Sequence, residues 1–159
     1  MKSTPDWRKK LIPASGLAAL GRRLRRAGKT IVLANGCFDL LHVGHLRYLQ
    51  AAKAHGDILL VALNADHSVR KLKGAGRPLM PARERAELIA GILGVDCVTI
   101  FGAPTVGTVI RALRPPFQAK GTDYTAKAVP DAALLASNGG RVVRGGDAKD
   151  HSQTEPIVK

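Results

Sequence analysis

The sequence predicts an α/β protein with a Rossmann-like parallel sheet of about five strands and helices on both faces. Short apolar runs alternate with helix-like segments about five times along the 159 residues, which is typical of strand–helix–strand units. The runs lack the polar alternation of half-exposed strands, so both faces of each strand should be buried. With 45% hydrophobic residues, the chain can bury the core of one such domain.

The first half of the chain should contain two strands and three helices. In order, we expect helix 16–27, strand 30–35, helix 43–55, strand 57–64 and a short helix 66–72. Gly28 and Gly56 follow the first two helices, as glycine often does just past a helix C-terminus. The runs TIVLAN and DILLVALN are apolar throughout their interiors, which predicts strands at the centre of the sheet.

The second half begins with a loop, 73–81, that is rich in glycine and proline. We then expect helix 82–93, strand 95–101, helix 105–113, strand 117–120, helix 130–137 and strand 141–144. The sequence Asn138-Gly139-Gly140 should end the last helix. Residues 1–12 are expected to form a loose tail, so the chain divides into 1–28, a tail and a basic helix, and 29–159, the main domain.

Charge and composition exclude several classes of protein. The net charge is +13 and aromatic residues make up 4%; the basic residues are dispersed and no aromatic RNA-binding motif is present, so small phosphorylated ligands are favoured over nucleic acid. No apolar run could cross a bilayer and no signal region follows the basic N-terminus, which predicts a cytoplasmic protein with no membrane partner. Cys37 and Cys97 form no C-x-x-C pair, so reduced thiols are expected.

The segment NGCFDLLHVGHLRYL, 35–49, indicates the ligand site. It follows the first buried strand and enters a helix, and ligands of parallel sheets bind beyond the carboxyl ends of the strands. A helix N-terminus there favours an anion such as phosphate. Gly36 allows a sharp turn and Gly44 leaves room between His42 and His45, whose N–H groups can donate to phosphoryl oxygens.

The two histidines could instead have a purely structural role or bind a metal. A histidine near a helix start often caps the helix or lies on the surface. Zinc would need a third ligand that the spacing does not offer, so no metal site is expected. The chain has no G-x-x-x-x-G-K-[ST] and no G-x-G-x-x-G after its first strand, which excludes a P-loop protein and disfavours a dinucleotide oxidoreductase.

The motif GCFDLLHVGH, 36–45, resembles the signature of the cytidylyltransferase-like nucleotidyltransferases, which share an H-x-G-H fold. Segments 64–89 and 120–124 are similar to the adenylyltransferase domain that makes ADP-heptose, and the similarity extends over 29–154. It implies that 29–159 is a nucleotidyltransferase domain that uses ATP with Mg²⁺ and a phosphorylated sugar, heptose 1-phosphate. A separate sugar kinase would supply this acceptor, because the kinase often fused to such domains is not in this sequence. A homodimer is left open.

The resemblance also implies roles for individual residues. The catalytic residues would be His42, His45 and Lys73. The nucleotide would be bound by Gly36, Cys37, Phe38, Gly44, Lys120, Gly121, Asp123, Ser152 and Thr154. The phosphates and the acceptor would be bound by Lys71, Arg77, Arg85, Asn64 and Asp66. Lys71 and Lys73 are expected on the glycine-rich loop, Asp39 should support a loop, and Asn64 and Asp66 could instead be helix caps.

The chain departs from the family pattern in several places, among them Arg83, which stands where the family commonly has an acidic residue. Ser152-Gln153-Thr154 stands where the family has S-T-T, and Pro156 interrupts the helix that should follow. The loop 102–105 lacks the acidic residues that the family usually has there. Two alternatives therefore stay open: a cytidylyltransferase that uses CTP and a phospho-alcohol or another phosphosugar, and a catalytically impaired module that binds nucleotides or nucleic acid.

Overall fold

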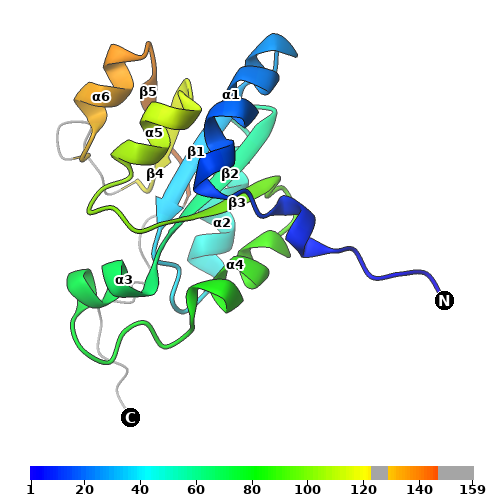
Figure 1. Ribbon diagram of the computed structural model, residues 1–159, viewed down its shortest axis with the longest axis vertical. Coiled ribbons are helices and arrows are strands. Elements are labelled where there is room, and N and C mark those ends of the chain that lie inside the picture. Colours follow the sequence, from blue (N-terminus) through cyan, green and yellow to red (C-terminus); the bar gives the residue numbers. More distant parts are fainter. Residues whose placement is uncertain (123–128, 147–159) are drawn as a thin grey trace.

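The computed structural model describes residues 1–122 and 129–146, and its centre is a parallel sheet (Figure 1). The strands are β1 (Ile31–Gly36), β2 (Ile58–Asn64), β3 (Cys97–Phe101), β4 (Phe117–Lys120) and β5 (Arg141–Arg144). They pair in the order β3-β2-β1-β4-β5, and all four pairings are parallel. The predicted fold class is confirmed, and each expected strand begins within two residues of its observed start.

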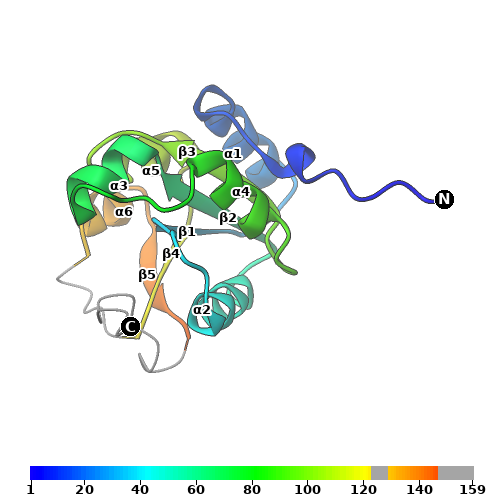
Figure 2. The ribbon, with the colours of Figure 1, turned by 90° about the horizontal axis from the view of Figure 1, so that it is seen from below.

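Helices cover both faces of the sheet, as expected. They are α1 (Leu17–Arg26), α2 (Val43–Lys53), α3 (Asp66–Lys73), α4 (Ala82–Ala90), α5 (Gly107–Leu113) and α6 (Ala132–Ser137). Figure 2 shows α2 on one side of the sheet and α1 and α5 on the other. Helix α4 ends earlier than predicted, because Gly91 caps it and the chain then turns toward β3. No helix in the described part of the chain is long and apolar enough to cross a bilayer.

The central strand β1 supplies alternate residues to two cores. Val32 and Ala34 pack in the core beneath α2 and α4, whereas Ile31 and Leu33 pack in the core beneath α1 and α5. All four side chains are fully buried. A strand covered on both faces needs apolar residues at every position, and this is the reason for its continuous apolar run.

Helix α1 approaches α5 so closely that only glycine fits between them. A Cβ atom on Gly21 would lie 2.5 Å from the carbonyl oxygen of Leu113. Arg25 donates a hydrogen bond of 2.7 Å to the same oxygen through Nη1. The basic helix is therefore part of the packed fold, and one of its arginines holds the C-terminal end of α5.

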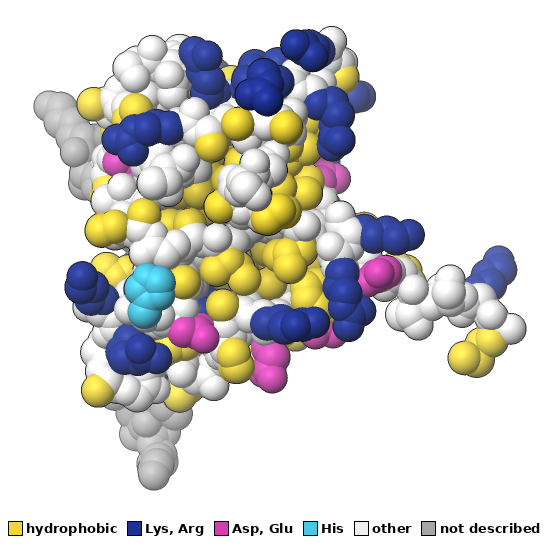
Figure 3. Space-filling model, viewed as in Figure 1, with side chains coloured by type: hydrophobic (Ala, Val, Ile, Leu, Met, Phe, Trp, Pro, Cys, Tyr) yellow, Lys and Arg dark blue, Asp and Glu magenta, His cyan; other side chains and the backbone are white. Residues whose placement is uncertain are grey.

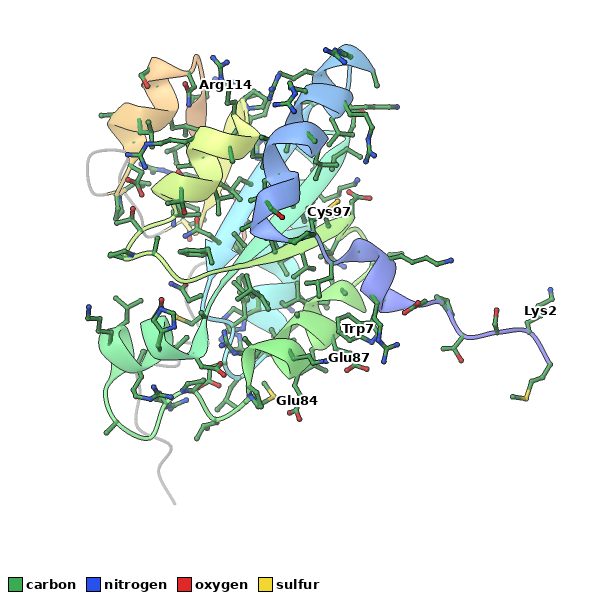
Figure 4. All side chains as sticks on the ribbon, viewed as in Figure 1. Lys2, Trp7, Glu84, Glu87, Cys97 and Arg114 are labelled. Carbon is green, nitrogen blue, oxygen red and sulfur yellow. The ribbon has the colours of Figure 1, made fainter. Side chains whose placement is uncertain are left out.

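The N-terminal segment is docked, so the expectation of a loose tail was wrong for residues 7–12. A 3₁₀ turn, η1 (Trp7–Lys10), packs against α4, and Figure 4 shows Trp7 beside that helix near Glu87. Lys10 Nζ donates to the carbonyls of Ala90 at 2.9 Å and Val95 at 2.8 Å. The Ile12 N–H then bonds to the carbonyl of Val98 on the edge strand β3. Long-range polar contacts of this kind are invisible in a hydrophobic pattern.

Candidate active site

The expected ligand end of the sheet contains a topological switch point. The chain passes from β1 outward to β2 and β3, and later returns to place β4 on the opposite side of β1. The carboxyl ends of β1 and β4 therefore flank the switch point where the strand order reverses, and ligands of open parallel sheets bind in the crevice expected at such a point. Helix α2 begins beside this crevice, after the loop that follows β1.

The two histidines open α2 as a reciprocal cap. His42 is the N-cap, and its Nδ1 accepts a hydrogen bond of 3.1 Å from the Gly44 N–H. His45 Nδ1 accepts one of 3.3 Å from the His42 N–H. Because both Nδ1 atoms are acceptors, each neutral ring carries its proton on Nε2. The rings stack with their centroids 4.0 Å apart, so the pair forms one unit at the helix N-terminus.

His45 is held in its neutral form. Its pKa is lowered from 6.5 to about 4, mainly by burial, and the electrostatic interactions of His45 with His42 and Lys73 lower it further. Phe38 adds to this burial, since its ring centroid lies 5.2 Å from that of His45. A neutral imidazole with its proton on Nε2 is a donor at any ordinary pH, which suits the stabilisation of a charged phosphoryl group.

The depressed pKa of His45 should make stability depend on pH. Between about pH 4 and pH 6.5 the unfolded chain binds a proton at this residue that the folded protein does not. The free energy of unfolding should therefore rise with pH through that window, and His45 should contribute no slope above it. Urea unfolding at several pH values would measure this in the native protein and in His45→Gln. Equal slopes in the two proteins would contradict the assignment.

Lys73 lies near the histidines, whereas Lys71 is on a different side of the same helix. The expectation that both occupy the loop was wrong, because both belong to the last turn of α3, which ends at Gly74. The charge of Lys73 is close enough to lower the pKa of both His45 and Cys37. Residues two apart on a helix point to different sides, so α3 directs only one of the two lysines toward the histidine pair.

This separation predicts different effects for the two lysines. Lys73→Ala should lower kcat/KM for the nucleotide by about 10- to 100-fold, the scale of one charge-assisted hydrogen bond. Lys71→Ala is the matched control, with a change expected below about threefold. Steady-state kinetics on the two variants would test this. Equal losses would mean that both lysines reach the phosphates, as the family resemblance implies.

Asp39 fastens the loop between α3 and α4 beneath the site, which confirms the prediction that it supports a loop. Its fully buried carboxylate accepts from the Leu79 N–H at 2.8 Å, the Met80 N–H at 3.0 Å and Arg77 Nη1 at 3.0 Å. Burial alone would raise the pKa of Asp39, but these hydrogen bonds outweigh it and hold the pKa below its usual value. Arg77 is thereby placed beside the loop that follows β1.

Arg85 joins three segments under the site. Its guanidinium is fully buried and donates to the carbonyls of Met80, Cys37 and Asn64 and to Asp66 Oδ1, over 2.7–3.0 Å. The same Asp66 oxygen accepts from the Ala82 N–H at the start of α4. Asp66 therefore caps a helix, as one of the two expectations for it stated. In this structure the guanidinium of Arg85 donates to protein oxygens. Its role in binding the acceptor stays a prediction.

Cys37 keeps its proton. Burial raises the pKa of this thiol, although the cations of Lys73 and Arg85 oppose the rise. Its Sγ lies 3.8 Å from Asn64 Oδ1 and donates to it. A protonated thiol is a poor nucleophile, which agrees with a backbone role for Cys37 rather than a covalent one.

The remaining predicted residues are placed only in part. Gly36 ends β1, Gly44 lies in the first turn of α2, and Lys120 ends β4 just before Gly121. Asp123, Ser152 and Thr154 lie outside the described residues. Within the described ranges, no cluster of three His, Cys, Asp or Glu side chains could hold a metal ion.

Two residues of this region, Asn35 and Gln118, were not predicted from the sequence. Asn35 lies at the end of β1, and its Oδ1 accepts from Gln118 Nε2 at 2.9 Å and from Lys120 Nζ at 3.2 Å. The signal that could have found them was a polar side chain at the end of one apolar strand and a second inside another.

Comparisons with known proteins identify similar sequences and a similar fold. The sequence profile of the cytidylyltransferase-like family matches residues 33–156. "Bifunctional protein HldE" of Syntrophotalea carbinolica is 50% identical over 74% of the chain, and that of Desulfatibacillum aliphaticivorans is 42% identical over 95%. The chain spans 24–31% of the length of these two relatives. A crystal structure of the lipopolysaccharide core biosynthesis protein from Thermoplasma volcanium is 25% identical, with a TM-score of 0.66, and covers 76% of this chain and 99% of its own.

Proposed function

Because the chain belongs to the cytidylyltransferase-like family, we propose that it transfers AMP from ATP to a sugar 1-phosphate, with heptose 1-phosphate as the acceptor. The observation that supports this most strongly is the stacked pair of histidines at the N-terminus of α2, beside the switch point. That arrangement offers N–H donors and a helix dipole to a phosphoryl group. The products would be ADP-heptose and pyrophosphate.

The proposed reaction is a nucleotidyl transfer by direct displacement at the α-phosphorus. An oxygen of the acceptor phosphate attacks the α-phosphorus and forms a new P–O bond. The bond from the α-phosphorus to the bridging oxygen of the β-phosphate breaks, and pyrophosphate leaves with that electron pair. The Nε2–H groups of His42 and His45 would donate to the phosphoryl oxygens as charge builds up. Lys73 would neutralise charge from α3, and Mg²⁺ would accompany the triphosphate as part of the substrate.

The choice of acceptor depends on similarity. The segment 64–89 contains Lys73, Arg77 and Arg85 and resembles the branch that acts on heptose 1-phosphate. The relatives named "Bifunctional protein HldE" are three to four times longer than the matched region.

Charge alone does not support a dedicated nucleic-acid binder. Figure 3 shows Lys and Arg side chains on several separate parts of the visible face, with acidic side chains between some of them. Nucleic-acid interfaces gather cations along one stripe or patch. The net charge of +13 is instead compatible with attraction of anionic small substrates.

The test is pyrophosphate release with Mg²⁺, using ATP, CTP and GTP, each with and without heptose 1-phosphate. Release that needs both ATP and the heptose phosphate would support the proposal in full. Release with CTP alone would assign the protein to the cytidylyltransferases. No release from folded protein with any triphosphate would overturn the enzymatic proposal, and salt-dependent binding to RNA or DNA would then favour the binding module.

A further inference from the structure

A largely buried polar cluster lies at the switch point, where β1 and β4 end. It consists of Asn35 on β1 and of Gln118 and Lys120 on β4. Leu33 is in register with Gln118, so Asn35, two positions on, lies opposite Lys120. Gln118 is fully buried and Lys120 is 9% exposed, whereas Asn35 is half-buried at the strand end. Asn35 is thus the most exposed member of the cluster.

The hydrogen bonds fix the orientation of the Asn35 amide. A lysine ammonium can only donate, so the Asn35 atom that faces Lys120 Nζ at 3.2 Å must be its oxygen. Gln118 Nε2 donates to the same oxygen at 2.9 Å. With two donors from β4 on its oxygen, the amide of Asn35 has its NH₂ group turned away from them. That group is the part of the side chain left to donate to a ligand at the switch point.

The hydrogen bond from Gln118 to Asn35 leaves a buried polar atom of Gln118 without a partner. Because Gln118 must donate to Asn35, its own Oε1 is left buried without a hydrogen-bond partner. A leucine at this position would fill a similar volume in the apolar core beneath α5 with no such defect. Buried unsatisfied groups are rare and call for an explanation, and here the explanation is the control of a neighbouring amide.

We propose that the Asn35 NH₂ group binds the nucleoside part of the nucleotide, through an acceptor atom of its ribose or base, and that Gln118 is the positioning residue that holds it. This inference rests on the proposed function and extends it from the phosphates to the nucleoside. The α2 terminus accounts for the phosphates on one side of the crevice. The crevice floor at β1 and β4 is then left for the part of the nucleotide that carries ring nitrogens and hydroxyl oxygens.

Two substitutions separate binding from positioning. Asn35→Asp keeps the shape and the oxygen that faces Lys120, but replaces the NH₂ donor by a second acceptor. Gln118→Leu removes the donor that holds Asn35 together with the unpartnered oxygen. Thr99→Val is the matched control, because Thr99 Oγ1 is also buried without a partner but lies on β3, two strands away from β1. Calorimetric titration with α,β-methylene-ATP measures nucleotide binding without turnover.

We expect Asn35→Asp to weaken binding of the ATP analogue by about 10- to 100-fold and Gln118→Leu by about three- to tenfold. The KM for the sugar phosphate should stay unchanged in both. Thr99→Val should bind the analogue like the native protein, and thermal melting should show all three variants folded. If Gln118→Leu does not fold, Asn35→Asp still decides the matter, because its carboxylate retains the contact with Lys120.

The two proposals fail in different ways. Native protein that binds the analogue, together with Asn35→Asp that binds it equally well, would overturn this inference and leave the proposed function intact. Native protein that binds no nucleoside triphosphate would overturn the proposed function and this inference with it. A loss in Thr99→Val as large as that in Gln118→Leu would show a general packing effect and would also overturn the positioning role.

Discussion

Replacing His45 by alanine is expected to lower turnover by about two to three orders of magnitude, the scale seen when one preorganised donor to a developing charge is removed. His45 is the third residue of α2, its ring is stacked on that of His42, and its pKa of about 4 keeps it a neutral donor. The fold should survive, since the lost side chain makes a single hydrogen bond of 3.3 Å to the backbone of its own helix turn.

His42 should show the same loss of turnover with an added loss of stability. Its Nδ1 caps α2, so His42→Ala should also cost about 0.5–2 kcal/mol of unfolding free energy. His42→Ser supplies a capping oxygen without an imidazole, and should recover stability but not turnover. His55→Ala serves as the control, because His55 is exposed beyond the other end of α2. Near-native turnover in His45→Ala would remove the histidine pair from the mechanism.

Replacing Arg85 by alanine should give the largest loss of stability in the protein, about 3–5 kcal/mol of unfolding free energy. The guanidinium is fully buried and donates to oxygens of four residues. Its removal leaves buried carbonyls without donors and opens a cavity at the same place. The loop after β1, the end of β2 and the start of α4 would all lose their common partner.

The measurement is urea unfolding of Arg85→Ala beside Arg85→Lys and Arg83→Ala. Lysine keeps the charge but cannot serve four oxygens from one planar group, so it should restore only part of the stability. Arg83 is exposed on the same helix, and its loss should change stability by less than about 0.5 kcal/mol. If Arg85→Ala were as stable as Arg83→Ala, the oxygens around the guanidinium would have to be satisfied in another way.

The parts of the fold that were predictable are those that depend on local pattern. The runs at β1 and β2 are apolar at every interior position because both faces of the sheet are covered, and that property is visible in the sequence. The H-x-G-H motif was correctly predicted to lie at the start of α2. Its spacing of three residues is the spacing of a capping box, in which the N-cap residue and the third helical residue cap each other.

Contacts between distant segments were not predictable in this way. Arginine is mostly a surface residue. The three carbonyls that accept hydrogen bonds from the buried Arg85 come from segments up to 48 residues away. Lys10 caps α4 across 80 residues of chain, so nothing near it in the sequence marks residues 7–12 as docked. The start of the loop was predicted one residue too early, because the glycine that ends α3 is Gly74, after both lysines.

The strand order also has a consequence for synthesis on the ribosome. Strands β1, β2 and β3 are synthesised in the order in which they pair. The other edge of β1, which faces away from β2, has no partner strand until β4 is synthesised. Gly36 ends β1 and Phe117 begins β4, so about 80 residues must be translated between them, or roughly 4–16 s at about 5–20 residues per second. One edge of the central strand is thus without its partner strand on the nascent chain for seconds.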